Sequence, residues 1–424
     1  MKQLAITITA HSPLAIGRKK PGGSVSEVEQ YIPGSVLRGA IASQILSLAE
    51  TPPEPDNPND DFTQLFTSAQ PAIFCNAYSA IAQTSSDTYQ RTEASTWVIP
   101  ATAVSAKANP GFQVTDGGGV FDTLIDRFCA ERAGYPYEPT PPDADAAGND
   151  QVEPFSGFYS CWNEQRCPHR VDTRLLTRVG INRKRAVAED QILYSVAVIN
   201  ESFQTNTRQQ PPEWEPMAFR GYIRVANDEL ADRMAAFINA RSRTLRLGSS
   251  GSRGLGKVTL EVQDAALPSD LNSRIDRFNA ALNQRWQTLW SLLSPTDLED
   301  RTYFTLDLQS DAILTDQWRR TITISPEMLQ RIEQAPSDDS LQLHATYSSY
   351  GYRSGWNAAW GLMKDQALVT QKGSVYLLST TRREAWLEAL TQLETLGIGD
   401  RTAEGYGQVR VCHEFHQIMR EELA

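Results

Sequence analysis

The sequence contains one glycine-rich segment twice, 151 residues apart (residue 398 against residue 247). LGSSGSRGLGKVTL at 247–260 aligns with IGDRTAEGYGQVRV at 398–411, and the alignment places Gly248, Gly254, Gly256 and Val258 on Gly399, Gly405, Gly407 and Val409. A stretch with helical periodicity precedes each copy, and an alternating, strand-like stretch follows each. The chain therefore repeats a unit of helix, loop and strand, which restricts it to folds with two similar halves.

Each copy also has candidate strands and a candidate helix upstream. In the first half these are strands at 2–16, 191–203 and 218–226 and a helix at 35–49; in the second they are strands at 302–314, 341–354 and 367–379 and a weaker helix at 325–334. The order strand, helix, strand, strand, helix, strand is typical of the ferredoxin-like fold, an antiparallel sheet with two helices on one face. The sequence thus predicts an α+β protein with two ferredoxin-like (RRM-like) domains.

We place the first domain at 1–262 and the second at 299–424. Between them, at 263–298, apolar residues recur at three- and four-residue steps, which predicts an amphipathic helix that connects the domains and packs between them. Residues from about 50 to 165 are assigned to an insertion in the first domain, because two proline-rich, acidic segments in it are typical of mobile loops. Within this insertion, 120–135 is long enough for one short helix.

Composition restricts the cellular compartment of the protein, the oxidation state of its cysteines and its mode of nucleic-acid binding. No run approaches the roughly 18 apolar residues of a membrane helix, and the first residues alternate like a strand instead of forming a signal peptide, so we expect a cytoplasmic protein. Five cysteines in 424 residues do not make a disulfide framework, and we expect them to be reduced. The formal net charge of -11 argues against indiscriminate coating of nucleic acid, but it leaves room for a local basic groove.

The densest basic stretch lies at 169–196, and from Arg170 to Arg185 six cations accompany the single carboxylate of Asp172. The cations are Arg170, Arg174, Arg178, Arg183, Lys184 and Arg185. Clustered cations bind phosphate backbones and make the affinity strongly dependent on salt. We therefore predict contact with nucleic acid here, against the plainer alternative of a solvated charged surface.

Two further segments near the N-terminus also carry groups that can bind phosphate. The loop after the first strand holds Arg18, Lys19 and Lys20, which we predict to contact RNA unless they form an ordinary solvated surface. YIPGSVLRGAIA at 31–42 begins a helix that Ser35 can cap, and Arg38 lies in its first turn. Free amides at such a helix start attract phosphate. The alternative is an ordinary capped helix with a solvent-exposed arginine.

The first glycine-rich copy is the third candidate for anion binding. Its glycines let backbone amides approach a ligand closely, and because they precede a strand rather than a helix, the segment is not a P-loop. The predicted RNA-binding residues of this copy are Gly248, Ser249, Ser250, Gly251, Ser252, Arg253, Gly254 and Lys257. The second copy has Asp400 and Glu404 in the places of Ser249 and Arg253, which predicts a poorer phosphate binder with a structural or protein-facing role.

Candidate groups for metal binding and catalysis are few. Cys161, Cys167 and His169 have the residue types of zinc ligands, and Cys129 would complete the set. The step between the first two is wider than in a zinc knuckle, so free, partly buried thiols are the alternative. His11 is the one candidate acid/base for RNA cleavage, against an ordinary surface histidine. We therefore predict a protein that is not an enzyme and has no cofactor other than this candidate zinc.

Several of these segments together resemble the RAMP superfamily of CRISPR effector proteins. The first-half segments are YIPGSVLRGAIA, RVGINRKRAVAEDQILYSVAVI and GSSGSRGLGKVTLEV; the second-half segments are SGWN, QKGSVYLLS and AEGYGQVRV. Their order and spacing cover nearly the whole framework outside the insertion, and they are most similar to the large two-domain RAMP subunit of type III-D complexes. The resemblance implies a subunit that holds the 5′ handle of the CRISPR RNA and caps the effector filament in antiviral defence.

The resemblance also implies partners. These would be the large polymerase-like subunit and the backbone RAMP subunits, with target RNA contacted indirectly. Backbone RAMP subunits that cut target RNA use an aspartate in the loop after the first strand, whereas 17–34 here contains Glu27 and Glu29 but no aspartate, so we expect no target cleavage. Two alternatives remain open: a metal-independent endoribonuclease that processes precursor RNA with His11, and a scaffold that contacts only proteins.

Overall fold

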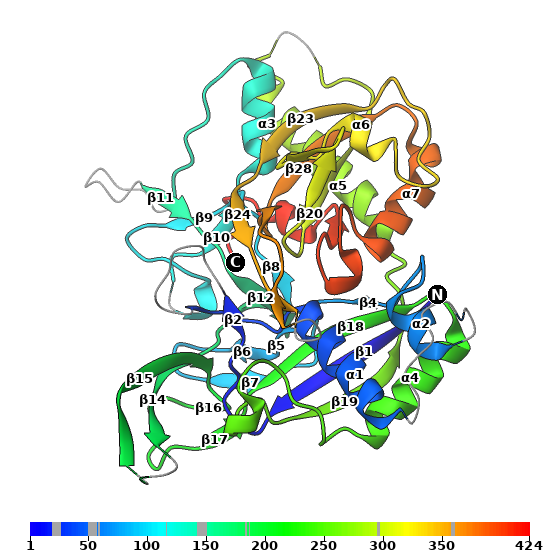
Figure 1. Cartoon of the computed structure of the whole chain (residues 1–424). Coiled ribbons are helices and arrows are strands. Elements are labelled where there is room, and N and C mark those ends of the chain that lie inside the picture. The colour runs from blue at the N-terminus through cyan, green and yellow to red at the C-terminus, as the bar shows by residue number, and fades with distance from the viewer. Residues whose placement is uncertain are drawn as a thin grey trace.

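Two antiparallel sheets with the same strand order form the framework of the chain. In this computed structural model the N-terminal sheet lies below and the C-terminal sheet above in the view of Figure 1, each with its own hydrophobic core. We call these parts the N-terminal half and the C-terminal half. The structure describes residues 1–18, 27–49, 57, 60–115, 117–141, 151–182, 185, 187–294, 297–357 and 361–424.

The N-terminal sheet is built around β1 (Lys2–Ala10), which pairs with β18 (Ala218–Val225) on one side and with β19 (Val258–Ala265) on the other. β4 (Ile73–Phe74) and β5 (Tyr78–Ser79) pair with the outer edge of β18. The resulting order is β19-β1-β18-β4, and each of these neighbours is antiparallel. The first and last framework strands of this half therefore lie side by side.

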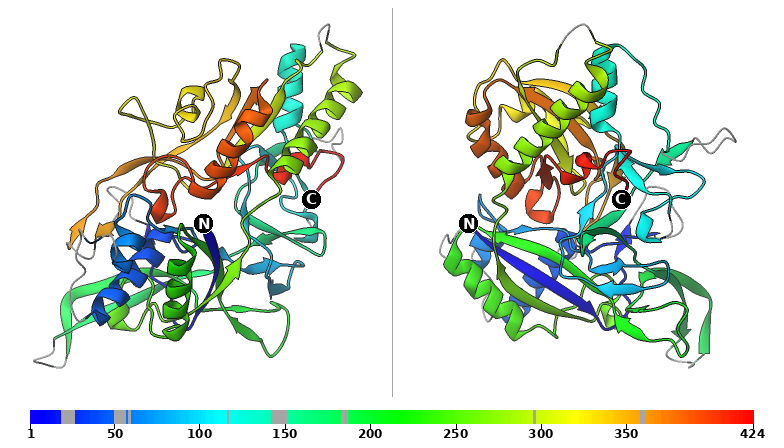
Figure 2. Two further views of the ribbon diagram at one scale, coloured as in Figure 1. Left: turned by 90° about the vertical axis from the view of Figure 1, so that its right-hand side faces the viewer. Right: turned by 180° about the vertical axis from the view of Figure 1, so that it is seen from behind.

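Two helices share one core with the N-terminal sheet. Leu4, Ile6 and Ile8 alternate toward one face of β1, and the buried residues of α1 (Gly34–Leu48) and α4 (Asp228–Ala240) pack in the same cluster with them. Both helices lie beside this sheet in the left view of Figure 2. Burial of these apolar faces holds the helices on the sheet, since isolated helices of this length are only marginally stable in water.

The C-terminal sheet repeats this arrangement. β20 (Thr302–Leu308) pairs with β28 (Val375–Thr380) and β29 (Val409–Val411), and β23 (Gln342–Tyr347) pairs with the outer edge of β28. The order is β23-β28-β20-β29. α7 (Arg383–Leu396) precedes β29 as α4 precedes β19. A single turn, α6 (Pro326–Leu329), stands where the N-terminal half has α1, in agreement with the weak helical pattern there.

The predicted α+β class is confirmed, but one framework strand was assigned to the wrong segment. The second strand of the N-terminal half is β4 with β5, which lies inside the segment assigned to the insertion, whereas 191–203 belongs mainly to the long hairpin of β14 (Thr173–Asn182) and β15 (Val187–Ile199). β4 and β5 have two residues each, too few to show an alternating pattern. The additional region therefore runs from the end of β5 to the start of β18.

The predicted connecting helix exists as α5 (Leu271–Arg285), but it does not pack between the halves. Its buried residues, among them Ile275 and Phe278, join the C-terminal core, where α5 contacts β20, β29 and α7. The apolar stripe seen in the sequence fixes one buried face of a helix, and it does not say which core receives that face. Helix α5 thus belongs to the C-terminal half.

The additional region crosses from one half to the other. Its helix α3 (Leu124–Ala133), which the sequence predicted, packs beside α5 in the C-terminal core (Figure 2). Phe112 and Phe121 pack against Phe415 near the end of the chain. Helix α2 (Asp61–Phe66) lies before this region, between α1 and β4. The other elements of the region are β6 (Ile81–Gln83), β7 (Tyr89–Arg91), β8 (Trp97–Val98), β9 (Ala103–Ala106), β10 (Val120–Asp122), β11 (Val152–Pro154), β12 (Phe158–Trp162), β13 (Gln165–His169), β16 (Ser202–Gln204) and β17 (Trp214–Pro216).

The remaining strands form short hairpins around the framework. They are β2 (Gly17–Arg18) with β3 (Glu27–Val28), β21 (Leu314–Asp316) with β22 (Arg319–Thr321), β24 (Tyr350–Arg353) with β27 (Ala367–Thr370), and β25 (Trp356–Asn357) with β26 (Leu362–Met363). In Figure 1 β24 reaches down from the C-terminal half toward the N-terminal half. In the described part of the chain, none of the helices combines the length and the apolar character required to cross a bilayer.

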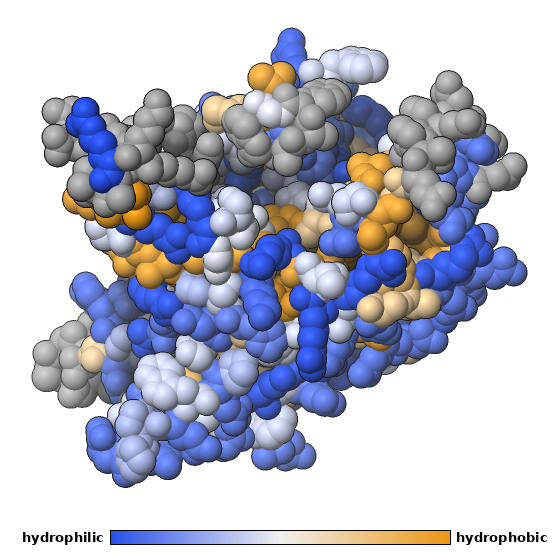
Figure 3. Space-filling model, turned by 60° about the horizontal axis from the view of Figure 1, so that its bottom comes forward, coloured by the Kyte–Doolittle hydropathy of each residue, from blue (hydrophilic) through white to orange (hydrophobic). Residues whose placement is uncertain are grey.

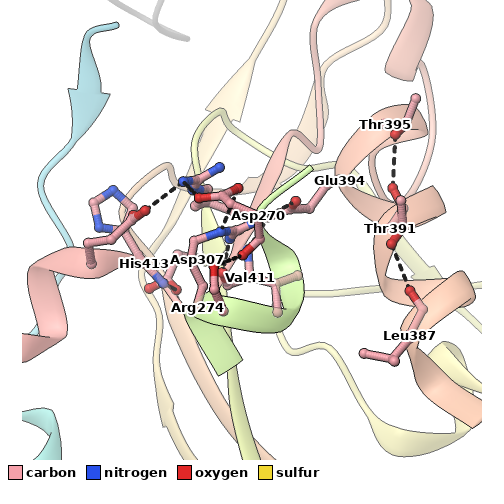
Figure 4. Close-up of polar contacts among 12 residues, drawn as sticks. Asp270, Arg274, Asp307, Leu387, Thr391, Glu394, Thr395, Val411 and His413 are labelled. Atoms are coloured by element: carbon pink, nitrogen blue, oxygen red, sulfur yellow. Dashed lines mark hydrogen bonds and ion pairs between the residues drawn. The ribbon is translucent and has the colours of Figure 1, made fainter. Parts of the chain in front are cut away.

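A fully buried arginine connects three elements of the C-terminal half (Figure 4). Arg274 of α5 donates two hydrogen bonds, of 2.8 and 2.7 Å, to the carboxylate of Glu394 on α7, and it also donates to the carbonyl of Val411 on β29. The same carboxylate accepts the Val411 N–H at 2.7 Å. Because Glu394 and Val411 lie on two other elements, this network fixes α5 and α7 against the last framework strand.

A second buried network attaches the additional region to the C-terminal half. The His416 imidazole lies 3.1 Å from Asp122 of β10 and 2.7 Å from Asp307 of β20, and all three side chains are almost fully buried. Burial lowers the pKa of His416, but Asp307 and Asp122 raise it to about 10. The imidazolium is therefore the folded form at neutral pH.

This network predicts a loss of stability in alkali. Since the folded pKa of His416 is raised above 6.5, its contribution is fully present below pH 6.5 and is lost as the pH rises toward 10. We expect the free energy of unfolding of the wild type to fall by more than about 1 kcal/mol relative to His416→Gln between pH 6.5 and pH 9 in urea titrations. Equal pH dependence of the two proteins would contradict this assignment.

Candidate nucleic-acid interface

The two glycine-rich copies have the same backbone conformation. We call residues 246–257 the first glycine loop and residues 397–408 the second glycine loop. Ser250 and Arg401, at equivalent places, have φ angles of 62° and 60°, and one turn of 3-10 helix follows each. Gly248 and Gly399 both have a φ of 84°, and a Cβ at Gly248 would lie 2.6 Å from the Ala15 carbonyl. These glycines are therefore needed by the fold at the bend before the last strand of each half.

Both glycine loops line one cavity of about 770 Å³ between the two halves. Its walls include Arg246, Gly248, Ser249 and Ser250 from the first loop, Arg401, Glu404, Gly405 and Tyr406 from the second loop, Ser35, Gly39 and Ser43 from α1, and Arg353 and Lys364 from the β24 to β27 region. The volume falls in the range of about 300–1,000 Å³ that is usual for small-molecule sites. A ligand in this cavity would touch both halves at once.

Close backbone contact joins the halves at one wall of the cavity. The Gly34 N–H, at the start of α1, donates to Asn76 Oδ1 at 2.9 Å. A Cβ on Gly34 would overlap the Phe74 carbonyl and would lie 2.9 Å from the Glu404 carbonyl, while a Cβ on Gly405 would lie 2.7 Å from Asn76 Oδ1. The start of α1 is thus packed against the second glycine loop, with room for no side chain at either glycine.

Charges in the cavity are mostly paired. Arg353, from β24, bridges Glu29 of the N-terminal half and Asp311 after β20, and its Nε donates to Asp311 Oδ2 at 2.6 Å. Burial raises the pKa of Asp311, but Lys372 and Arg353 lower it by more, so this carboxylate is ionised. This ion-pair cluster ties the β24 strand to both halves.

The first-loop side of the cavity carries an unbalanced positive charge. Arg246 is exposed and donates one long hydrogen bond of 3.4 Å to the Leu255 carbonyl. Among the described residues, no carboxylate forms an ion pair with it. The Ser249 and Ser250 side chains line the same side. A cation with two neighbouring hydroxyl groups is suited to bind a phosphate.

The basic hairpin contacts the first glycine loop. Arg178 of β14 donates to the Arg253 carbonyl at 2.9 Å, and Arg253 in turn donates to the Tyr194 hydroxyl of β15 at 2.7 Å, with its guanidinium 5.6 Å from the centre of that ring. Two groups that the sequence predicted separately, the hairpin cations and the loop cations, therefore form one surface. Arg185 is exposed in the turn of the same hairpin.

Other predicted contacts lie elsewhere. Arg174 is bound to Glu201 at 2.7 Å, and Arg38 is directed to α2, where it donates to the Phe66 carbonyl. Arg18 ends β2, and Lys257 is exposed beside His11 at the end of β1. Lys19, Lys20, Arg183 and Lys184 lie outside the described residues. Ser35, in contrast, lines the cavity; it lies inside α1, whose N-cap is Pro33, so the expectation that Ser35 caps the helix was wrong.

The first glycine loop offers fewer free amides than the sequence suggested. The N–H groups of Ser249, Arg253, Gly254 and Leu255 all donate to carbonyls within the fold. The amides hold the bend in place, because a buried or half-buried N–H without a partner is costly. These four amides are therefore already used by the fold, whereas the side chains of the loop could still contact an anion.

The candidate zinc ligands are distributed over two regions. Cys129 lies on α3 in the C-terminal core, whereas Cys161, Cys167 and His169 lie on β12 and β13. Both ring nitrogens of His169 are in hydrogen bonds, to the Ser79 carbonyl at 2.6 Å and to Ser160 Oγ at 2.7 Å. Within the described ranges, no three His, Cys, Asp or Glu side chains are arranged to hold a metal ion. Elemental analysis of the purified protein tests the zinc prediction.

The candidate acid/base His11 lies outside the cavity lining. Its Nε2 is 2.6 Å from the Thr259 hydroxyl of β19, and its backbone N–H donates to the Lys257 carbonyl. Cleavage of RNA without a metal requires a second proton donor or acceptor. The contact that the structure gives to this imidazole is a threonine hydroxyl on the neighbouring strand.

Comparisons with known proteins gave matches only among solved structures. No protein-family model matches the chain, and no curated protein does. Three of the similar structures are cryo-EM structures described as type III-B Cmr-beta: one bound to cognate target RNA and AMPPnP in state 1, one bound to cognate target RNA, and one in the apo state. Each is a type III assembly. Their titles name the same broad class of complex as the sequence resemblance.

The similarity is low in detail. In the order just given, the TM-scores are 0.39, 0.40 and 0.30, and the sequence identities are 12%, 11% and 12%. The alignments cover 88%, 96% and 62% of this chain and 86%, 96% and 97% of the matched chains. At this level of similarity the alignments do not establish which residues correspond, so no residue of the interface is assigned from these structures.

Several cavity residues were missed in the sequence. Arg401 and Tyr406 stand in the second copy of the repeat, whose acidic substitutions had suggested a role away from RNA. Arg246 directly precedes the first copy and would have been found by extending that segment by one residue. Arg353 and Lys364 carry no sequence signal, because only the fold brings β24 and its neighbours to the two glycine loops.

Proposed function

We propose that this chain is a non-catalytic, RNA-binding subunit of a type III CRISPR effector complex. It holds the 5′ handle of the CRISPR RNA and caps the backbone filament in antiviral defence in the cytoplasm. The partners are the CRISPR RNA, the large polymerase-like subunit and the backbone RAMP subunits, with target RNA contacted indirectly. The resemblance of the sequence segments to the RAMP superfamily supports this proposal, as does the strand order of each half, which is that of a ferredoxin-like domain.

One observation carries the proposal: the basic hairpin and the first glycine loop meet beside the cavity. Arg178 donates to the Arg253 carbonyl there, and Arg246, on the cavity side of the same loop, forms no ion pair with a carboxylate of the described residues. Phosphate contacts position an RNA strand, and unstacked bases insert into pockets or stack on aromatic rings and guanidinium groups. Tyr194 beneath Arg253 supplies such a surface.

The surrounding surface agrees with a polar partner. Figure 3 views the molecule from the side of the N-terminal half, and the face is mostly hydrophilic, with hydrophobic side chains in separate patches. On the hairpin, the side chains of Leu175, Ile181 and Leu193 are 62%, 67% and 70% exposed. Leu175 and Leu193 lie on the opposite face of the hairpin from Arg178 and Tyr194, so these exposed apolar side chains do not interrupt the contact with the first glycine loop.

Replacing Arg178 and Arg253 tests the phosphate contacts. We expect Arg178→Ala with Arg253→Ala to weaken binding of CRISPR repeat RNA and to reduce the salt slope of log K by about 0.7 for each phosphate that is no longer neutralised. Fluorescence anisotropy with labelled RNA across a salt series measures both quantities. Lysine at both positions keeps the charges and should restore the slope. Arg233→Ala is the matched control, because it removes an exposed arginine of α4 that pairs with Asp61 outside the cavity lining.

The same RNA distinguishes the alternatives. Discrete cleavage products in EDTA that disappear in His11→Gln would make the chain an endoribonuclease instead of a passive binder. Unchanged slope and affinity in the double alanine variant would remove the proposed RNA interface. Absence of any RNA crosslink to this chain in the assembled complex would favour the scaffold that contacts only proteins.

A further inference from the structure

The second glycine loop faces the same cavity as the first, although its acidic residues had suggested a structural or protein-facing role. Arg401, Glu404, Gly405 and Tyr406 all line the cavity, opposite the N-terminal half. A loop that served only to support the fold would need no functional side chains here. The second glycine loop therefore contributes residues to the same cavity as the first glycine loop.

The second-loop side of the cavity combines donors, an acceptor and an aromatic ring. Glu404 accepts from Arg401 at 3.1 Å and from Lys364 at 2.9 Å. Burial raises the pKa of Glu404, but these two cations lower it by more, so the carboxylate is ionised and its charge is compensated. The Arg401 guanidinium lies over the Tyr406 ring, 5.0 Å from its centre, and both residues line the cavity.

The two sides of the cavity thus suit different chemical groups. Arg246 with Ser249 and Ser250 suits a phosphate, because its positive charge has no carboxylate partner among the described residues. On the second-loop side Arg401 and Lys364 are already paired with Glu404, so this side offers a phosphate less free positive charge than Arg246 does. An uncharged base fits it instead, because the base can stack on Tyr406 and exchange hydrogen bonds with Glu404 and Lys364 at its edge. A nucleotide contains both groups within one small molecule.

We infer that the cavity is a nucleotide pocket in which the second glycine loop binds one unpaired RNA base on Tyr406 while the first glycine loop holds an adjacent phosphate. This inference rests on the proposed RNA-binding function and extends it to the C-terminal half. Because the two loops belong to different halves, one nucleotide contacts both. The remaining nucleotides follow the basic hairpin.

The full chain and an RNA with the sequence of the 5′ handle test this pocket. The fluorescent base 2-aminopurine, placed at one position at a time, should be quenched on binding at a single position, where it stacks on Tyr406. Tyr406→Leu should remove that quenching and lower the affinity roughly tenfold, since base stacking on an aromatic ring typically contributes that much. Tyr406→Phe keeps the ring and should retain both. Tyr350→Leu, at an exposed tyrosine outside the cavity lining, is the control.

An abasic site at the same RNA position tests the contact from the other partner. It should weaken binding to the wild type as much as Tyr406→Leu does, and the two changes together should cost no more than either alone. Additive effects, or quenching that persists in Tyr406→Leu, would overturn the base pocket. Because the abasic site changes only the RNA, comparing intact and abasic RNA on the wild-type protein still tests the pocket if Tyr406→Leu misfolds. If the wild type does not bind the RNA at all, the proposed function fails instead.

Discussion

Arg274→Met should lower the free energy of unfolding by about 3–5 kcal/mol, the usual cost of removing one partner of a buried ion pair. The substitution keeps much of the side-chain volume, so the destabilisation arises from charge and hydrogen bonding. Glu394 would remain buried with its negative charge uncompensated, and the Val411 carbonyl would be deprived of a donor. Urea unfolding followed by circular dichroism measures the change.

A neighbouring arginine on the same helix supplies the control. Arg277 is exposed, and its guanidinium lies 3.9 Å from Glu414, so Arg277→Met should change the stability by no more than about 0.5 kcal/mol. Arg274→Met with Glu394→Leu removes both charges and should recover part of the stability. Similar stabilities for Arg274→Met and Arg277→Met would show that the network in Figure 4 does not hold α5 and α7 together.

Gly34→Ala should destabilise the protein by about 1–3 kcal/mol or more, because the added Cβ overlaps the Phe74 carbonyl and crowds the Glu404 carbonyl of the other half. The atoms that the Cβ would meet belong to the backbone, so a change of side-chain rotamer cannot relieve the clash. The start of α1 would have to move away from the second glycine loop, and this would open the contact between the halves at the cavity wall.

The same helix offers a glycine at which alanine should have the opposite effect. A Cβ added at Gly39 would have no heavy atom within 4 Å, so Gly39→Ala should stabilise the protein by about 0.5–1 kcal/mol through better helix propensity. Differential scanning calorimetry of both variants compares the same substitution at two places on one helix. A Gly34→Ala protein as stable as Gly39→Ala would refute the close contact between α1 and the second glycine loop.

Sequence patterns predicted the parts of the fold that repeat. The alignment of the two glycine-rich copies correctly anticipated a common loop, and in the structure Ser250 and Arg401 have matching φ angles. Sequence patterns could not locate β4 and β5, since strands of two residues show no periodicity. The prediction that α5 packs between the halves was wrong, because an apolar stripe shows that one face of a helix is buried but not which core buries it.

The candidate site was predictable only where its residues are clustered in the sequence. The hairpin cations and the first glycine loop were found from local composition, and the structure brings Arg178 and Arg253 together. The rest of the cavity depends on contacts over long sequence distances. Arg353 pairs with Glu29, which lies 324 residues earlier, and no local pattern indicates such a pair.

The crossing of α3 into the C-terminal core has a consequence for synthesis of the chain. Phe128 of α3 packs against Tyr303, which the ribosome adds much later. At a translation rate of about 5–20 residues per second, the apolar side of α3 would wait on the order of 10–35 s for that partner. By the end of this interval the nascent chain carries the strands of the N-terminal sheet together with α3 and α5, whose apolar sides still lack the C-terminal sheet. We therefore expect that expressing residues 1–298 alone yields an aggregation-prone fragment, and that the two halves must be made as one polypeptide or supplied together.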